Sequence, residues 1–135
     1  MGTPRETRHV SEWIDRPAPD VYAFAADPAN LPRWAAGLSS GIEQVGDEWF
    51  ADSPMGRVGV RFAPSNEFGV LDHDVTLPSG QVFHNPMRVV ADGDACEVVF
   101  TVRRMPEVSD AEFERDAAAV AADLGTLRRL LEAAG

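Results

Sequence analysis

The last quarter of the chain carries the clearest hydrophobic pattern. Between Ser109 and Ala133 the large apolar residues recur at steps of three and four, the spacing of one face of an α-helix. Ser109 and Glu112 have the spacing of a capping box, in which each side chain satisfies an amide of the first turn. The pattern therefore predicts a long helix over 109–133. Its apolar face consists of Phe113, Ala117, Val120, Leu124, Leu127 and Leu131.

A second row on this helix contains only small residues. Ala117, Ala121 and Gly125 follow one another at a spacing of four. A glycine inside a helix costs roughly 1 kcal/mol relative to alanine, so its presence suggests a function for the space it leaves. We expect this row to border a cavity beside the apolar face. The alternative is that alanine is present because it favours helices.

The middle of the chain alternates apolar and polar residues, which is typical of antiparallel strands. Turn sequences rich in Gly, Pro, Asn and Asp interrupt the alternation. We predict a first strand over 7–14, followed by two short helices that begin at Pro19 and Pro28, the second reaching Trp34. Six further strands are expected at 41–45, 48–52, 57–63, 70–77, 81–91 and 94–104.

The first of two hairpin turns determines which side chains of the sheet face each other. Pro78-Ser79-Gly80 suits a three-residue loop, with glycine in the left-handed position. This loop pairs His73 with Asn85. The two side chains should then be cross-strand neighbours, close enough to interact.

The second turn, Asp92-Gly93, suits a two-residue loop and pairs Val89 with Cys96. The two hairpins, considered separately, place the same residues on the face toward the helix. A slip of one residue would bury the charged residues of these strands instead, which supports this assignment of the faces. The inward apolar residues are Val58, Val60, Phe62, Leu71, Val75, Phe83, Met87, Val89, Val98, Phe100 and Val102, and the inward polar residues are His73, Asn85 and Cys96.

Composition restricts the partners of the chain. With 135 residues and 44% hydrophobic content, we expect a single domain over 1–135. Twelve basic and 22 acidic residues give a net charge of −10, which repels phosphate backbones and anionic membrane surfaces. We therefore expect no nucleic-acid partner and no membrane insertion. The N-terminus has no signal-peptide pattern, and the single Cys96 cannot form an internal disulfide, so we expect a cytoplasmic protein.

The order of these elements resembles the helix-grip fold of the SRPBCC superfamily (START-like, Bet v 1-like). Within it, the chain is most similar to bacterial polyketide cyclase/dehydrase-like proteins. The local match consists of Ile14-Asp15-Arg16-Pro17, Val21, Phe24, Asp27-Pro28 and Leu31-Pro32-Arg33-Trp34. The fold class expected is α+β, with a seven-stranded curved antiparallel sheet around the C-terminal helix and two short helices after the first strand. The resemblance implies a cavity between sheet and helix for an apolar small molecule.

Members of this superfamily include carriers of lipids and plant metabolites, aromatase/cyclases, oxygenase catalytic domains and chaperone co-factors. This sequence lacks the glycine-rich loop of the plant-allergen members and the Cys-x-His arrangement of the oxygenase members. The predicted register also places no strand arginine inside, which argues against a polar active site of the cyclase type.

His73 is the main candidate for chemistry. It is either a cavity histidine bonded to Asn85 or water, or half of a pair that orients a ligand, or an acid/base catalyst. A metal pair of His73 with His84 would need a four-residue loop at 77–80, so we expect no metal and no cofactor. Cys96 is expected to be a small buried hydrophobic residue. Trp34 is the best candidate for the mouth of a cavity.

The sequence thus favours a binder of an apolar or aromatic small molecule, as a carrier or a sensor. The alternatives are a polyketide aromatase/cyclase-like enzyme that uses His73 and Asn85, and an acidic protein-interaction module with a filled core. The oligomeric state, monomer or homodimer, is left open. The predicted ligand-binding residues are Trp34, Phe62, Leu71, His73, Phe83, Asn85, Met87, Cys96, Phe100, Ala117, Ala121 and Leu124.

Overall fold

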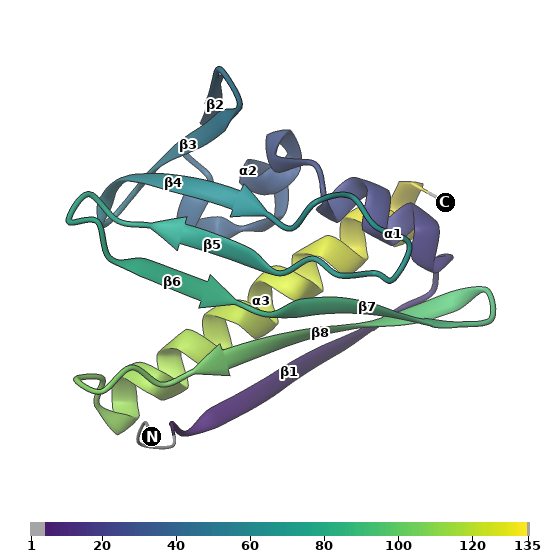
Figure 1. Cartoon of the computed structure of the whole chain (residues 1–135). Coiled ribbons are helices and arrows are strands. Elements are labelled where there is room, and N and C mark those ends of the chain that lie inside the picture. Colours follow the sequence, from purple (N-terminus) through teal and green to yellow (C-terminus); the bar gives the residue numbers. More distant parts are fainter. Residues whose placement is uncertain (1–4, 135) are drawn as a thin grey trace.

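A computed structural model describes residues 5–134 of the chain. Residues 1–4, the start of the N-terminal stretch considered above for a signal sequence, and Gly135 lie outside the described residues. The strands form a curved antiparallel layer, and the long C-terminal helix α3 (Asp110–Ala134) crosses its inner side diagonally (Figure 1). Among the described helices, none combines the length and apolar character needed to cross a bilayer.

The predicted order of elements is confirmed. The first strand and the short helices precede a series of hairpins, and α3 follows the last strand. The elements before α3 are β1 (Thr7–Ile14), α1 (Ala18–Ala25), η1 (Pro28–Asn30), α2 (Leu31–Trp34), η2 (Ala36–Leu38), β2 (Ile42–Val45), β3 (Glu48–Ser53), β4 (Gly56–Phe62), β5 (His73–Thr76), β6 (Val82–Asn85), β7 (Met87–Asp92) and β8 (Ala95–Arg103).

The expected seven-stranded sheet is corrected in one respect, because the predicted strand 81–91 is divided at Pro86. Proline has no N–H to donate to a strand ladder, so the strand ends at Asn85 and resumes at Met87. The described chain therefore has a five-stranded sheet in the order β2-β3-β4-β5-β6 and a three-stranded sheet in the order β1-β8-β7. The two stay adjacent at the division, where the Thr101 N–H donates to the Pro86 carbonyl at 2.9 Å.

The first predicted hairpin register is confirmed. His73 pairs with Asn85 across β5 and β6, and the Leu77 N–H donates to the Gln81 carbonyl at 2.8 Å. The loop over 78–80 has glycine in the left-handed region, with φ 91° at Gly80. The composition of this turn was thus sufficient to set the pairing.

The second register is wrong by two residues. The loop consists of Gly93 and Asp94, so Val89 pairs with Val98 instead of Cys96. Gly93, with φ 61°, occupies the first loop position, where a type II′ turn requires glycine. A shift of two residues keeps every side chain on its face. Val89, Cys96 and Val98 are all buried, so the predicted inner face is unaffected.

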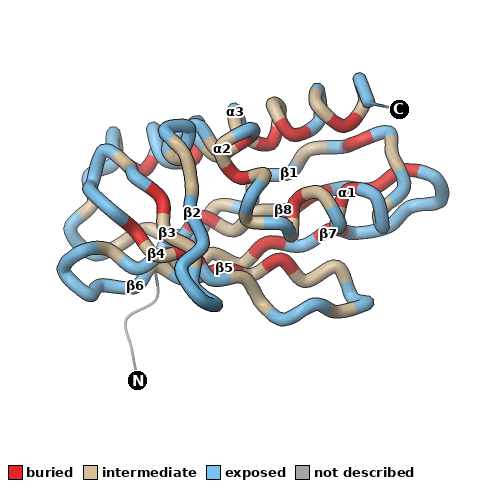
Figure 2. Tube along the Cα trace, turned by 90° about the horizontal axis from the view of Figure 1, so that it is seen from above, coloured by how far each residue is buried: buried red, intermediate tan, exposed pale blue. Residues whose placement is uncertain are grey.

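The predicted apolar face of α3 packs against the sheet. Phe113 is 2% exposed, and Leu124 and Leu127 are fully buried. Buried positions recur along the side of α3 that faces the strands (Figure 2). The capping box is also confirmed, since the Glu112 N–H donates to the Ser109 hydroxyl at 3.2 Å.

Ion pairs hold β1 along α3. Arg8 pairs with Glu114 at 2.7 Å, and Arg128 pairs with Glu12 at 3.2 Å. The Arg8 guanidinium also lies over the ring of Phe113, 5.0 Å from its centroid. Exposed ion pairs contribute little stability by themselves, so their main effect is to set the orientation of helix and strand.

The loop between β4 and β5 depends on one glycine. Gly69 has φ 73°, and its carbonyl accepts from the Val89 N–H at 2.9 Å. A Cβ at this position would lie 2.3 Å from the Val89 carbonyl oxygen. Gly93 has a similar φ, but a Cβ there would meet nothing within 4 Å. Comparing substitutions at Gly69 and Gly93 therefore distinguishes the effect of backbone strain from that of steric contact.

We predict that Gly69→Ala destabilises the protein more than Gly93→Ala. Both substitutions place alanine in the left-handed region, at about 1–2 kcal/mol. Only Gly69→Ala also forces the 66–69 loop away from β7, which should add about 1–3 kcal/mol. Denaturant unfolding of both variants measures the difference. Equal losses of unfolding free energy would contradict the close approach of this loop to Val89.

Candidate functional site

A cavity of about 440 Å³ lies between the five-stranded sheet and α3. This volume falls within the range of small-molecule sites, roughly 300–1,000 Å³. The walls come from α2 and η2, from the turn between β3 and β4, from β4, β5 and β8, and from the middle of α3. Apolar side chains make up most of the lining. The polar side chains among them are Ser53, His73, Asp116 and Asp123.

His73 is the buried polar residue of the lining, with 8% of its surface exposed. Its ring stacks on Phe62 at a centroid distance of 4.9 Å and meets Phe100 edge-on at 5.6 Å. Its Nδ1 lies 3.0 Å from the Leu71 carbonyl, which can only accept, so Nδ1 carries the proton. Burial lowers the pKa of His73. The neutral ring therefore leaves Nε2 as a hydrogen-bond acceptor.

Two carboxylates lie on the α3 side of the cavity. Burial raises the pKa of Asp123, whose Oδ1 accepts from the Ala36 N–H at 3.1 Å. Burial, with a smaller contribution from nearby Glu112, also raises the pKa of Asp116. The hydrogen bond from Ala36 joins η2 to α3 and keeps one wall of the cavity in place.

Trp34 forms another part of the wall and is 4% exposed. Its indole Nε1 is the one buried side-chain nitrogen or oxygen of the described residues that has no hydrogen-bond partner. A buried donor without a partner costs about 1–3 kcal/mol. An oxygen of a bound molecule could therefore stabilise the protein at this position.

Some of the predicted site residues meet at this cavity. Trp34, His73, Phe100 and Leu124 line it. The others lie behind or beside it: Leu71, Met87 and Cys96 are fully buried in the core, Phe62 packs on His73, Ala117 is buried under α3, and Phe83 and Asn85 are partly buried on β6. The role of these residues in ligand binding stays a prediction.

Asn85 does not act on His73 as expected. The two residues pair in the ladder, but the imidazole bonds to the Leu71 carbonyl instead. Asn85 is also absent from the lining. The Leu71 carbonyl lies two residues away along the chain and accepts from the ring, so no second side chain has to be ordered to satisfy it.

The row of small residues on α3 does not border the cavity, which corrects the prediction for Ala121. Ala121 is exposed, and the lining contains Asp116, Ala119, Val120 and Asp123 instead. In a helix of 3.6 residues per turn, each step of four turns the position by about 40°. The row therefore drifts away from the apolar face on the side opposite the cavity.

The sequence did not predict the wall that the turn between β3 and β4 contributes. Pro54 and Met55 line the cavity there, although Met55 is 61% exposed. The turn was interpreted only as a boundary between strands. An exposed methionine in a short turn was the available signal, because methionine is frequent at adaptable binding surfaces.

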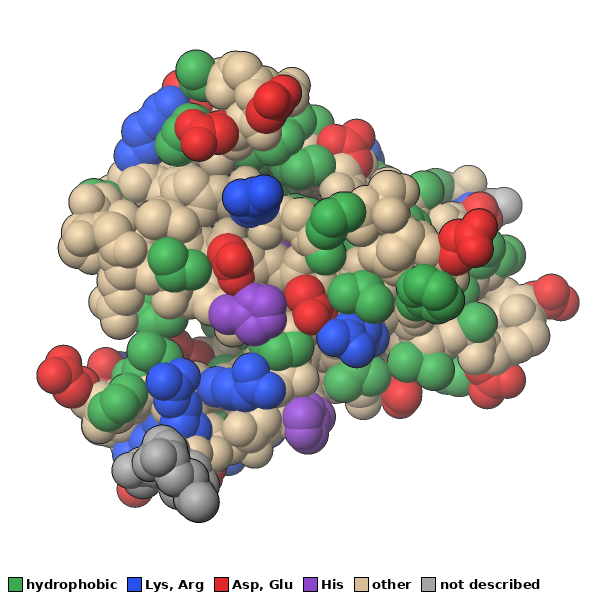
Figure 3. Space-filling model, viewed as in Figure 1, with side chains coloured by type: hydrophobic (Ala, Val, Ile, Leu, Met, Phe, Trp, Pro, Cys, Tyr) green, Lys and Arg blue, Asp and Glu red, His purple; other side chains and the backbone are tan. Residues whose placement is uncertain are grey.

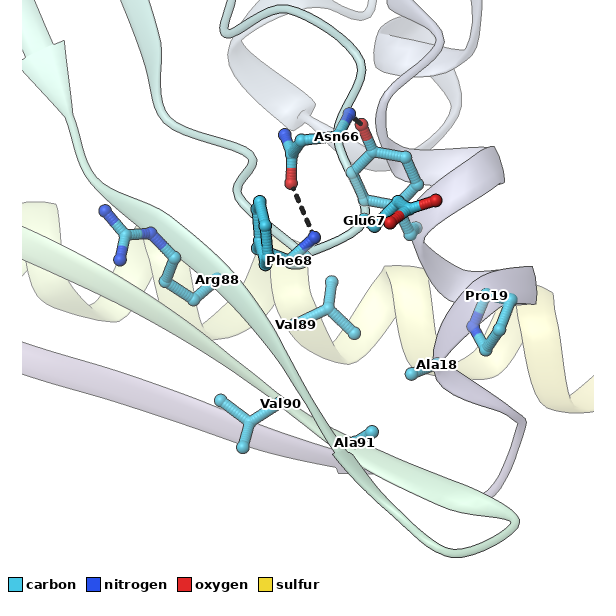
Figure 4. A pocket seen from close by; sticks show the side chains of 11 residues that line it. Ala18, Pro19, Asn66, Glu67, Phe68, Arg88, Val89, Val90 and Ala91 are labelled. Carbon is cyan, nitrogen blue, oxygen red and sulfur yellow. Dashed lines mark hydrogen bonds between the residues drawn. The ribbon is translucent and has the colours of Figure 1, made fainter.

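A larger hollow of about 780 Å³ shares no lining residue with this cavity (Figure 4). It is bordered by α1, the 66–69 loop and β7. Asn66 orders this loop, since its Oδ1 accepts from the Phe68 N–H at 3.0 Å and its own N–H donates to the Tyr22 hydroxyl at 3.0 Å. Phe68 nevertheless remains 83% exposed.

The face of the sheet turned away from α3 carries acidic, basic and histidine side chains close together (Figure 3). Asp74 pairs with His84 at 2.6 Å, and Asp72 pairs with Arg88 at 2.9 Å. His84 thus lies on the face opposite His73, as the predicted register requires. Within residues 5–134 no group of three or more His, Cys, Asp or Glu side chains is placed to hold a metal ion.

Comparisons with known proteins identify the fold. No protein-family model and no curated protein matches the sequence. Among solved structures, an uncharacterized protein from Bacillus thuringiensis aligns with a TM-score of 0.72 and 14% identity, over 93% of this chain and 98% of its own. A START superfamily protein from Mycobacterium smegmatis aligns with a TM-score of 0.68 and 11% identity, over 98% and 100% of the two chains.

The norcoclaurine synthase of Thalictrum flavum, solved in complex with dopamine and hydroxybenzaldehyde, aligns with a TM-score of 0.64 and 16% identity. The alignment covers 95% of this chain and 87% of the synthase. Such identities establish the fold alone. The chain has the helix-grip fold of the START-like and Bet v 1-like proteins, as the resemblance to the SRPBCC superfamily implied.

We predict that His73 makes the protein less stable in mild acid. Because burial lowers its pKa in the folded state, the unfolded chain takes up the proton first below about pH 6.5. The contribution of neutral His73 to the unfolding free energy is complete above that pH. It is lost as the pH falls toward the pKa of the folded state, by at most about 1.4 kcal/mol per pH unit.

The test compares the parent with His73→Phe by urea unfolding at several pH values between 5 and 7.5. The variant leaves the Leu71 carbonyl without its donor, but that cost is the same at every pH. The remaining histidines and the flanking Asp72 and Asp74 are common to both proteins. The unfolding free energy of the parent should fall more steeply with acid, and parallel curves would contradict a neutral buried His73.

Proposed function

We propose that the protein binds an apolar or aromatic small molecule in the cavity under α3, as a carrier or a sensor. The observation that carries this proposal is the cavity itself. It has about 440 Å³ of space between the sheet and α3, with a lining that is mostly apolar. Space of this size with a mostly apolar lining is typical of small-molecule sites.

The likeness in fold supports the same proposal. A START superfamily protein and an enzyme solved with two aromatic molecules, dopamine and hydroxybenzaldehyde, share the architecture. A filled interior would have favoured the acidic interaction module, and the cavity argues against it. The buried Cys96 is compatible with a reducing compartment, so we infer that the protein acts in the cytoplasm.

A binding role fits the polar groups better than a cyclase-like reaction does. The proposed cyclase mechanism needs a donor that polarises a ligand carbonyl. Neutral His73 offers the lone pair of Nε2 to the cavity, and Asn85 is not part of the lining. These groups can orient a ligand that donates a hydrogen bond, but they form no donor pair for a carbonyl.

We predict that Ala119→Leu weakens ligand binding and Ala121→Leu does not. Both alanines are exposed on α3, but only Ala119 lines the cavity. The added side chain at position 119 should occupy the space of the ligand and reduce affinity about tenfold, the effect of about 1.4 kcal/mol. Both variants should keep parental stability within about 0.5 kcal/mol, as surface changes do.

The measurement uses N-phenyl-1-naphthylamine, an apolar dye whose fluorescence rises in an apolar site. Titration gives the affinity for each variant, and thermal unfolding checks stability. Equal affinities for both variants would show that the dye binds elsewhere. The absence of saturable binding to the parent would overturn the proposed function.

Trp34 provides an independent report on the place of binding. It is the one tryptophan that lines the cavity, whereas Trp13 is exposed on β1 and Trp49 lies on β3. We expect energy transfer from tryptophan to the bound dye to fall strongly in Trp34→Phe. The same substitution removes an indole N–H without a partner but also shrinks a buried side chain, so thermal unfolding of the variant is the control. Undiminished transfer in Trp34→Phe would place the dye outside this cavity.

A further inference from the structure

The acidic residues of α3 differ in whether an arginine neutralises them. Three of them are paired, since Asp110 bonds to Arg104, Glu114 to Arg8 and Glu132 to Arg128. Glu112 is used in the capping box. Among the described residues, Asp116 and Asp123 form no ion pair.

These two unneutralised carboxylates are the charged residues that line the cavity. Asp116 and Asp123 lie seven residues apart, which places them on one side of α3, about 10 Å from each other along its axis. Within the described chain, the lining contains no arginine. The only bond of Asp123 is to the Ala36 N–H, and it does not neutralise the charge.

A second polar group of the cavity also accepts hydrogen bonds. His73 is more than nine-tenths buried and lines the cavity, and its Nδ1 is taken by the Leu71 carbonyl. The Nε2 of the neutral ring has no partner among residues 5–134. The two carboxylates and this imidazole nitrogen can therefore each accept a hydrogen bond from a molecule in the cavity.

From these observations we infer that the cavity selects apolar or aromatic amines, with the protonated nitrogen bonded to one of the two carboxylates, Asp116 or Asp123, and attracted by the other, and with a hydroxyl or N–H of the ligand at His73. The inference rests on the proposed function, because it names the ligand class of the same site. A carboxylate or phosphate on the ligand would lie against two like charges and would be repelled. A neutral apolar molecule would fit but would leave the three acceptors without donors.

Three naphthalene compounds test the charge preference on one skeleton. They are 2-(1-naphthyl)ethylamine, neutral 1-ethylnaphthalene and anionic 1-naphthylacetate, each measured by displacement of N-phenyl-1-naphthylamine at pH 7.5. A charge-assisted hydrogen bond should make the amine bind about tenfold tighter than the neutral compound. The anion should bind most weakly.

Two variants test whether Asp116 and Asp123 cause the preference for the amine. In Asp116→Asn and Asp123→Asn the ratio of the amine affinity to the 1-ethylnaphthalene affinity should fall several-fold. Glu107→Gln is the matched control, because Glu107 is exposed outside the cavity and its change alters the net charge equally. Asp116 is itself exposed, so its variant tests the site without risk to the fold.

The inner acceptor is tested with a hydroxylated probe. Addition of a hydroxyl at the far end, as in 6-(2-aminoethyl)-2-naphthol, should improve binding to the parent, and His73→Phe should abolish that gain. If the hydroxyl does not improve the affinity of the parent, or if His73→Phe keeps the improvement, the placement of a ligand donor at His73 is overturned.

The outcomes separate the two proposals. Equal binding of the three compounds to the parent would overturn the amine preference and leave the cavity as an apolar site. An amine preference that persists in both Asn variants would overturn the role of the two carboxylates. Binding of none of the compounds, or of the dye, would overturn the proposed function itself.

Discussion

The packing of α3 against the curved strands is the interaction on which the rest of this structure depends. The apolar face of the helix buries Phe113, Leu124, Leu127 and Leu131, while the strands supply Ile14, Met87 and Val98 beneath it. The sheet is divided at Pro86; α3 packs directly on β1 and β8 of one part, and the cavity separates it from β4 and β5 of the other. An isolated helix of this length would be marginal in water, and neither sheet could bury its inner face alone.

The cavity is a consequence of this packing. The ends of α3 lie close to the strands, where Arg8 and Arg128 tie it to β1. In its middle, the lining runs from Asp116 to Leu124, and α2 and the β3–β4 turn complete the walls. Leu124 belongs to both the core and the cavity, so a bound molecule would contact a residue that also holds the fold together. Ligand binding should therefore stabilise the folded state.

The fold alone does not decide between a carrier and an enzyme, because similar architecture supports both. The side chains in the cavity offer mainly hydrogen-bond acceptors. One buried imidazole, with its proton committed to a main-chain carbonyl, and two carboxylates on the helix can accept, and the Trp34 indole N–H can donate. Such a set is suited to an apolar molecule that carries polar groups.

Local sequence patterns predicted α3 and the inner face of the sheet, and the resemblance to the SRPBCC superfamily predicted the fold. The apolar spacing on 109–133, the Ser109–Glu112 capping box and the 78–80 turn were enough, because each is a local rule of backbone geometry. The error at Gly93-Asp94 did not matter for the faces, since a shift of two residues preserves alternation.

The side of α3 that borders the cavity depends on the packing of elements distant in the chain, and could not be predicted from the sequence pattern. Ala121 and Asp123 lie two residues apart in the sequence, yet one is in solvent and the other lines the cavity. Likewise, His73 and Asn85 were correctly paired, but the Leu71 carbonyl takes the imidazole proton. Cavity walls come from elements distant in the chain, such as η2 and the β3–β4 turn, and their approach depends on how the whole sheet curves. No local pattern encodes that curvature.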